Sequence, residues 1–181
     1  MSDIIDFFNN KVVHPNGYSL SDIIDGYSND KLEKSHDIIQ WLFPLSEPSH
    51  FNPDAPLLTQ EDIDYFSSLE ARYAAGNYYC TIHRMLAFFG LKISFSPSID
   101  YQTDVELADD FEARKYTWAE AFNHNHLRIT RMLKSMVLLG WGEWARAICD
   151  FLVEYKGDSS GNNDWKVNEN SKQYWIEAVQ Q

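Results

Sequence analysis

Four polar side chains that could bind an anion lie in the segment NHNHLRITRMLKS, residues 123–135. On a helix, His124, Arg128, Arg131 and Ser135 follow one another at spacings of three or four residues and therefore share one face. The planar guanidinium group of arginine can donate two parallel hydrogen bonds to a carboxylate or a phosphate. Leu127 and Leu138 flank this polar row, so we expect the helix to pack on both sides, with the two arginines facing a cleft or a covered polar layer. The opposite face is an apolar stripe formed by Ile129, Met132, Leu133, Met136, Val137 and Leu139.

The charge distribution singles out the same segment. Residues 114–134 carry an excess of four positive charges, whereas the whole chain, with 27 acidic and 15 basic residues, has a formal net charge of −12. An acidic surface repels nucleic acid, so we expect no nucleic-acid partner. The local positive charge instead favours a peptide or a small anionic ligand. In the alternative interpretation, Arg128 and Arg131 pair with carboxylates of the chain itself, such as Asp37 and Asp54, because buried arginines are usually paired.

A second group of reactive side chains lies in HDIIQWLFPL, residues 36–45. If this segment is helical, His36 and Gln40 are one turn apart, and Asp37 and Trp41 form the adjacent row. A His-Asp doublet also occurs in metal-dependent phosphohydrolases, so a hydrolase of phosphoesters or nucleotides that uses His36, Asp37 and His124 is an alternative function. The chain has no His-x-x-x-His, Cys-x-x-Cys or Gly-rich phosphate loop, and we therefore predict no catalytic residues, no metal site and no cofactor.

The elements that position these residues are predicted to be helices. Prolines and glycines separate stretches of helical periodicity, and no stretch alternates for long enough to indicate a sheet. The fold class is therefore all-α, a single-domain multi-helix bundle with long irregular loops and little or no sheet. The predicted helices cover residues 3–9, 21–27, 30–43, 59–75, 77–89, 117–139, 143–155 and 165–179, and the helical region 117–139 is expected to break near residues 123–125. An acidic connection is predicted at 92–111 and a flexible loop at 157–164.

Length and composition limit the class of protein. At roughly 150 residues a domain, a chain of 181 residues forms one domain, residues 1–181. No apolar run approaches the roughly 18 residues of a transmembrane helix, and the acidic N-terminus is unlike a secretory signal. We therefore expect a soluble, cytoplasmic protein. The sequence does not predict its oligomeric state.

Four motifs resemble the conserved region of the opioid growth factor receptor family. They are HDIIQWLFPLSEP, FNPDAPLLT, RMLAFFGLKI and NHNHLRITRMLKS, and their order and spacing match as well, over residues 18–179. The resemblance implies a soluble helical domain without known catalytic residues. It also implies a receptor role, since the founding animal member binds methionine enkephalin and acts as a negative regulator of proliferation. The chain is expected to be a single-domain member without the basic targeting stretches and repeat tail of the animal protein.

The two motifs that carry polar residues supply the candidate ligand-binding site. The positions that the resemblance carries over include His36, Gln40 and Trp41 from the first motif, and His124, Asn125, Arg128 and Arg131 from the last. The chain departs from the animal pattern at Ile38, Ser46 and His126, where the animal motif has Tyr, Arg and Asn. We predict a non-enzymatic binding or regulatory domain whose cleft lies between these two segments. The arginines would bind an anionic group, while Trp41 supplies apolar contact and Asn125 and Gln40 supply hydrogen bonds.

Overall fold

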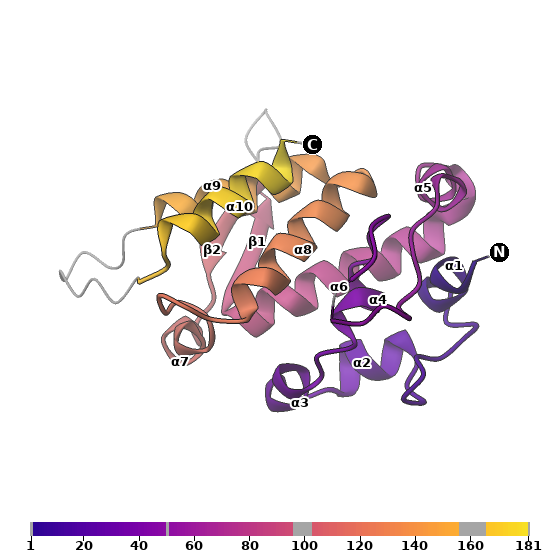
Figure 1. Ribbon diagram of the computed structural model, residues 1–181, viewed down its shortest axis with the longest axis horizontal. Helices are drawn as coiled ribbons and strands as arrows, with labels where there is room; N and C mark the ends of the chain where they lie inside the picture. The colour runs from indigo at the N-terminus through magenta and orange to yellow at the C-terminus, as the bar shows by residue number, and fades with distance from the viewer. Residues whose placement is uncertain (1, 50, 96–102, 156–165, 181) are drawn as a thin grey trace. The chain divides into compact units, whose positions relative to one another are not determined.

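The structure, a computed structural model, describes residues 2–49, 51–95, 103–155 and 166–180 (Figure 1). Helices dominate these residues, which confirms the predicted fold class. The chain divides into two compact units, one formed by Met1–Arg84 with Leu138–Gly140 and the other by Met85–Val137 with Trp141–Gln181. The single-domain organisation stays a prediction, and the loop expected at 157–164 lies outside the described residues.

The first unit is built from short helices around an aromatic core. Its elements are α1 (Asp3–Phe8), α2 (Leu20–Gly26), α3 (Asn29–Lys34), α4 (Ile39–Leu42), α5 (Gln60–Phe66), the 3-10 helix η1 (Leu69–Ala71) and the first part of α6 (Arg72–Phe89). Phe8 and Phe43 meet Tyr78 edge to face, with ring centroids 5.5 and 5.9 Å apart. Because all three rings are buried, this cluster forms the centre of the unit.

The prediction of one continuous helix over residues 30–43 is wrong. The chain leaves helical conformation at Ser35, whose hydroxyl donates to the carbonyl oxygen of Lys31 at 2.8 Å, and it turns helical again only at Ile39. This hydrogen bond satisfies a carbonyl group at the end of α3 and so stabilises the stop. His36 and Asp37 therefore lie in the break, and His36 does not share a helical face with Gln40.

The helix predicted at 59–75 starts correctly and ends differently. Thr59 and Asp62 form the expected capping box, in which each side chain accepts a hydrogen bond from the other residue's backbone. The helix stops at Phe66, and the hydroxyl of Ser68 donates to the carbonyl oxygen of Tyr65 at 2.7 Å. Gly76, predicted to be a stop, lies inside α6, because one glycine costs about 1 kcal/mol in a helix and the buried face of α6 outweighs it.

The second unit contains the end of α6, a two-stranded hairpin and the last four α-helices. Its further elements are β1 (Leu91–Phe95), β2 (Thr103–Leu107), α7 (Phe111–Arg114), the 3-10 helix η2 (Lys115–Thr117), α8 (Asn125–Leu138), α9 (Gly142–Glu154) and α10 (Glu169–Val179). Figure 1 shows α9 and α10 side by side, and α9 also contacts β2. These contacts place the C-terminal helices beside the hairpin.

Two predictions for this unit need correction. The acidic connection expected at 92–111 contains the antiparallel hairpin, in which Lys92 pairs with Glu106 and their charged atoms lie 3.5 Å apart. The acidic residues of β2 occupy its exposed face, so in the sequence they resemble those of a solvated loop. The helical region predicted from Thr117 is helical only after its expected break, from Asn125 onward, because Thr117 belongs to η2 and its hydroxyl donates to the carbonyl oxygen of Arg114.

Candidate functional site

A pocket of about 260 Å³ opens between the beginning of α8 and the beginning of α10. We call it the α8–α10 pocket, and both helices belong to the second unit. Its lining consists of Phe122, Asn123, His126, Leu127, Thr130, Asn168, Ser171 and Tyr174. Four of these eight residues come from the NHNHLRITR segment that the sequence singled out, and Phe122 directly precedes it. The other three come from α10 or its cap.

Asparagine side chains fix the beginning of α8. The side-chain oxygen of Asn123 accepts a hydrogen bond from the backbone nitrogen of Asn125 at 2.9 Å. The amide of Asn125 is buried and donates to the carbonyl oxygen of Thr117 at 3.0 Å. These bonds satisfy a donor at the helix start and tie it to the preceding 3-10 turn, so the pocket begins on ordered backbone. Asn125 is therefore a structural residue in this unit.

His126 forms the floor of the pocket and connects three segments. Its Nε2 lies 2.7 Å from the carbonyl oxygen of Trp118, and its Nδ1 lies 2.8 Å from the hydroxyl oxygen of Ser171. A carbonyl group only accepts, so the ring proton is assigned to Nε2, and the Ser171 hydroxyl then donates to Nδ1. The indole nitrogen of Trp175 donates to the His126 carbonyl oxygen at 3.1 Å. Hydrogen bonds to Trp118, Ser171 and Trp175 thus hold the floor of the pocket.

Burial lowers the pKa of His126 below its ordinary value of 6.5. The hydrogen bond to the Trp118 carbonyl opposes this shift, and the nearby His124 adds to it slightly. Water solvates an imidazolium ion better than this buried site does, so the folded protein favours the neutral ring.

Replacing His126 with Asn is expected to weaken the acid sensitivity of folding. Because the folded protein holds the His126 pKa below 6.5, the unfolded chain binds a proton there first as the pH falls. The wild-type stabilisation is complete above pH 6.5 and is lost as the pH falls from that value through the lowered pKa. Urea unfolding from about pH 7 to pH 5 should give a smaller loss of unfolding free energy in His126→Asn. Equal losses in the two proteins would contradict this assignment.

The rim of the α8–α10 pocket is apolar and exposed. The exposed fractions are 87% for Phe122, 55% for Leu127 and 56% for Tyr174. Single exposed apolar residues are common, but three around one pocket form a small patch that water solvates poorly. A pocket with an apolar rim and a neutral polar floor suits a large apolar side chain of a ligand.

The predicted arginine row is only partly accessible. Arg128 is 6% exposed and Ser135 is fully buried, Arg131 is half-buried, and His124 is exposed. Arg128 and Arg131 both take part in polar or ring interactions of the chain. Arg131 follows Leu127 by four residues, so it lies one turn beyond the pocket rim along the same row of α8.

The candidates from the first motif lie in the first unit. Trp41 is buried, with ring centroids 5.2 Å from Phe7 and 5.4 Å from His14, so it belongs to the core. Gln40 is buried as well. With its amide oriented so that the nitrogen faces acceptors, that nitrogen donates to the backbone carbonyl oxygens of His36 at 3.2 Å and Asp37 at 2.6 Å. His36 is exposed. The expected cleft between this motif and α8 stays a prediction.

The hydrolase alternative finds no support in the described residues. Within them, no three His, Cys, Asp or Glu side chains are grouped so that they could hold a metal ion. Asp37 instead lies 3.8 Å from the buried His14, between Nε2 and a carboxylate oxygen. In the described part of the chain, no helix combines the length and the apolar character that a membrane crossing needs.

Sequence reasoning missed the residues that close the pocket from α10. Ser171 and Tyr174 lie more than 40 positions after His126, and no local pattern connects such distant residues. Two features of the sequence near α8 do indicate a binding surface. Phe122 is a single aromatic residue in a polar stretch, and Leu127 interrupts the polar side of the helix, as a residue on a binding surface would.

Comparison with known proteins identifies the family. The model of the opioid growth factor receptor (OGFr) conserved region matches residues 1–181. The opioid growth factor receptor of Mus musculus is 35% identical over 155 residues, 83% of this chain and 23% of the mouse protein. The human receptor is 34% identical over 157 residues, 83% of this chain and 21% of its own length.

A second group of relatives gives the same result. Opioid growth factor receptor-like protein 1 of Mus musculus is 33% identical over 150 residues, which cover 81% of this chain and 30% of the mouse protein. The chain thus spans less than a third of the length of these curated relatives. No solved structure matches. The chain belongs to the family defined by the opioid growth factor receptor conserved region.

Proposed function

We propose that the chain is a non-enzymatic peptide-binding domain and that the α8–α10 pocket receives an apolar side chain of the peptide. The observation that carries the proposal is the exposed apolar rim of Phe122, Leu127 and Tyr174 around a neutral floor. The relatives are named receptors of a growth factor or receptor-like proteins, which supports a ligand-binding role over an enzymatic one.

An anionic group of the same peptide would meet the basic side of α8. Arg131 is half-buried and lies one turn beyond Leu127, so a carboxylate next to an apolar residue could reach both. A guanidinium group that is partly desolvated binds a carboxylate more strongly than an exposed one does. Arg128 is too buried for direct contact with a bulky ligand. Its proposed role is to add positive charge near the site and to keep the neighbouring side chains in position.

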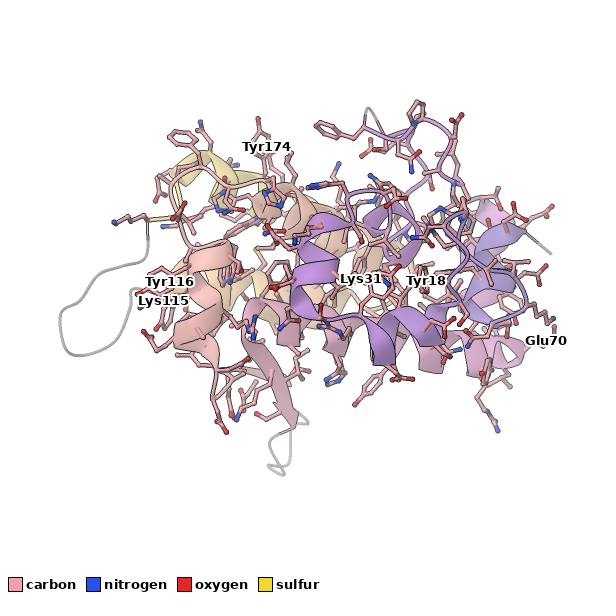
Figure 2. The ribbon with its side chains drawn as sticks, turned by 90° about the horizontal axis from the view of Figure 1, so that it is seen from below. Tyr18, Lys31, Glu70, Lys115, Tyr116 and Tyr174 are labelled. Carbon is pink, nitrogen blue, oxygen red and sulfur yellow. The ribbon has the colours of Figure 1, made fainter. Side chains whose placement is uncertain are left out.

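Isothermal titration with methionine enkephalin, the peptide that the family resemblance implies, tests the proposal. Phe122→Ala and Tyr174→Ala should each weaken the Kd at least about tenfold, because a buried aromatic anchor contributes more than about 1.4 kcal/mol. Tyr116→Ala is the matched control, since Tyr116 is also exposed but lies outside the pocket lining; Figure 2 labels both tyrosines. Its Kd should stay within a factor of about two.

The carboxylate contact has its own test. A peptide with an amidated C-terminus should bind the wild-type protein more weakly, and Arg131→Ala should abolish the difference between the two peptides. A difference that persists in Arg131→Ala would remove this arginine from the site. If wild-type protein binds neither enkephalin nor any member of a displayed peptide library, the peptide-binding function is wrong.

A further inference from the structure

A second pocket, of about 390 Å³, lies in the first unit against α2 and the beginning of α3. Its walls include two tyrosine rings, from Tyr18 and Tyr27, and two carboxylates, from Asp22 and Asp25. The ring centroids are 5.3 Å apart and the ring planes are nearly perpendicular. Two rings at this angle present their faces to a common space, which is the geometry that recognises organic cations.

That space holds an ammonium group of the chain itself. The Nζ atom of Lys31 lies 3.7 Å from the centroid of Tyr18 and 3.8 Å from that of Tyr27. Figure 2 shows the labelled side chains of Lys31 and Tyr18 next to each other. Because both distances are well inside the roughly 6 Å limit for a cation–π interaction, Lys31 marks where a cation is stabilised.

Other groups of the pocket also favour a bound cation. Asp22 accepts hydrogen bonds from the backbone nitrogen and hydroxyl of Ser19, and these bonds, with a smaller effect from Lys31, lower the pKa of its carboxyl group. With Asp25 the wall carries two negative charges against the single positive charge of Lys31. Tyr27 is buried, and its hydroxyl accepts a hydrogen bond from the amide of Asn16 at 3.3 Å. The Tyr27 ring is therefore held in place, whereas Tyr18 is 40% exposed.

We propose that this pocket is a binding site for the alkylammonium group of a peptide, and that Lys31 is an internal occupant which the ligand displaces. A lysine side chain has four rotatable methylene groups, so Lys31 can leave the rings without moving α3. The ligand cation would be a lysine side chain, methylated or not, or an N-terminal amine. This inference does not rest on the α8–α10 pocket, whose residues it does not use.

Titration with tetramethylammonium chloride, followed by NMR of the Tyr18 and Tyr27 ring protons, tests the site. Lys31→Met retains an unbranched apolar side chain and removes the internal cation, so the probe should bind at least about tenfold more tightly than to the wild type. Adding Tyr18→Ala should abolish this gain. Lys34→Met is the control, because Lys34 is an exposed lysine of the same helix outside the pocket lining, and it should bind as the wild type does. No saturable binding to Lys31→Met would overturn the proposal.

Two peptides distinguish the sources of the cation in the wild-type protein. One is N-terminally acetylated and contains a single trimethyllysine, and the other has a free N-terminal amine and no lysine. The peptide that binds should move the Lys31 side-chain resonances downfield, out of the ring currents of the two tyrosines. Binding without this shift, or no binding of either peptide, would overturn the proposal.

Discussion

Replacing Trp118 with Ala is expected to lower the free energy of unfolding by about 3 to 5 kcal/mol. The Trp118 side chain is fully buried, and its ring meets Phe89 at a centroid distance of 5.9 Å. Its indole nitrogen donates to the Phe89 carbonyl oxygen at 2.9 Å in the buried interior. The substitution leaves a cavity and removes the donor, so both losses add to the destabilisation. Denaturant unfolding measures the effect.

Two further variants separate these losses. Trp118→Phe retains most of the ring volume but leaves the Phe89 carbonyl without its donor, which should cost about 1 to 3 kcal/mol. Phe122→Ala is the matched control, because Phe122 lies four residues further on and is exposed, and its effect should stay within about 0.5 kcal/mol. If Trp118→Ala costs less than about 1 kcal/mol, the ring is not packed as described.

Replacing Gly90 with Ala is expected to cost about 2 to 4 kcal/mol of unfolding free energy. Gly90 ends α6 with a φ of +75°, in the left-handed region that favours glycine. A Cβ atom there would lie 2.8 Å from the Cβ of Arg114 and 2.9 Å from the Cα of Phe111. The backbone of α7 must move to accept it. Thermal and denaturant unfolding report the loss.

Gly17→Ala provides the control for Gly90→Ala. Gly17 has a similar φ of +88°, but a Cβ atom there would meet no atom within 4 Å. This variant therefore measures the left-handed strain alone, about 1 to 2 kcal/mol. The difference between the losses of unfolding free energy in the two variants measures the cost of the overlap with α7. Equal costs at the two glycines would show that α7 yields without resistance.

Local signals predicted where helices begin or stop when a side chain caps the backbone. Thr59 with Asp62 marked the start of α5, and Gly90 marked the end of α6, because both act on neighbouring backbone groups. The breaks at Ser35 and at residues 67–68 were missed. A serine inside a helix and a serine that ends a helix look identical in the sequence. Whether the helix continues depends on which side chains each segment buries.

The hairpin and the α10 side of the pocket were missed for a different reason. The strands are short, and the acidic residues of β2 alternate with only half-buried ones, so the periodic signal is weak. Ser171 and Trp175 meet His126 across 45 and 49 positions of the chain. Such contacts depend on tertiary packing, and a single sequence contains no local trace of them.

The arginine row shows how far helical periodicity reaches. It predicted correctly that Ile129, Met132, Leu133 and Met136 are buried and that α8 is covered on more than one side. The expected covered position of the arginines agrees with the burial of Arg128, but the periodicity does not predict that Leu127 is exposed. Periodicity assigns residues to faces of a helix, but only the neighbouring elements decide which face is open.

The hydrogen bonds of His126 join parts of the chain that are synthesised at different times. During translation α8 leaves the ribosome well before α10, and until Ser171 and Trp175 emerge, the Nδ1 atom of His126 has only water to bind and the indole of Trp175 is absent. Between the emergence of α8 and that of α10, the α8–α10 pocket therefore has only the wall that α8 supplies. It closes only when the last described helix folds onto α8, so the nascent chain cannot display this pocket before the second unit is complete.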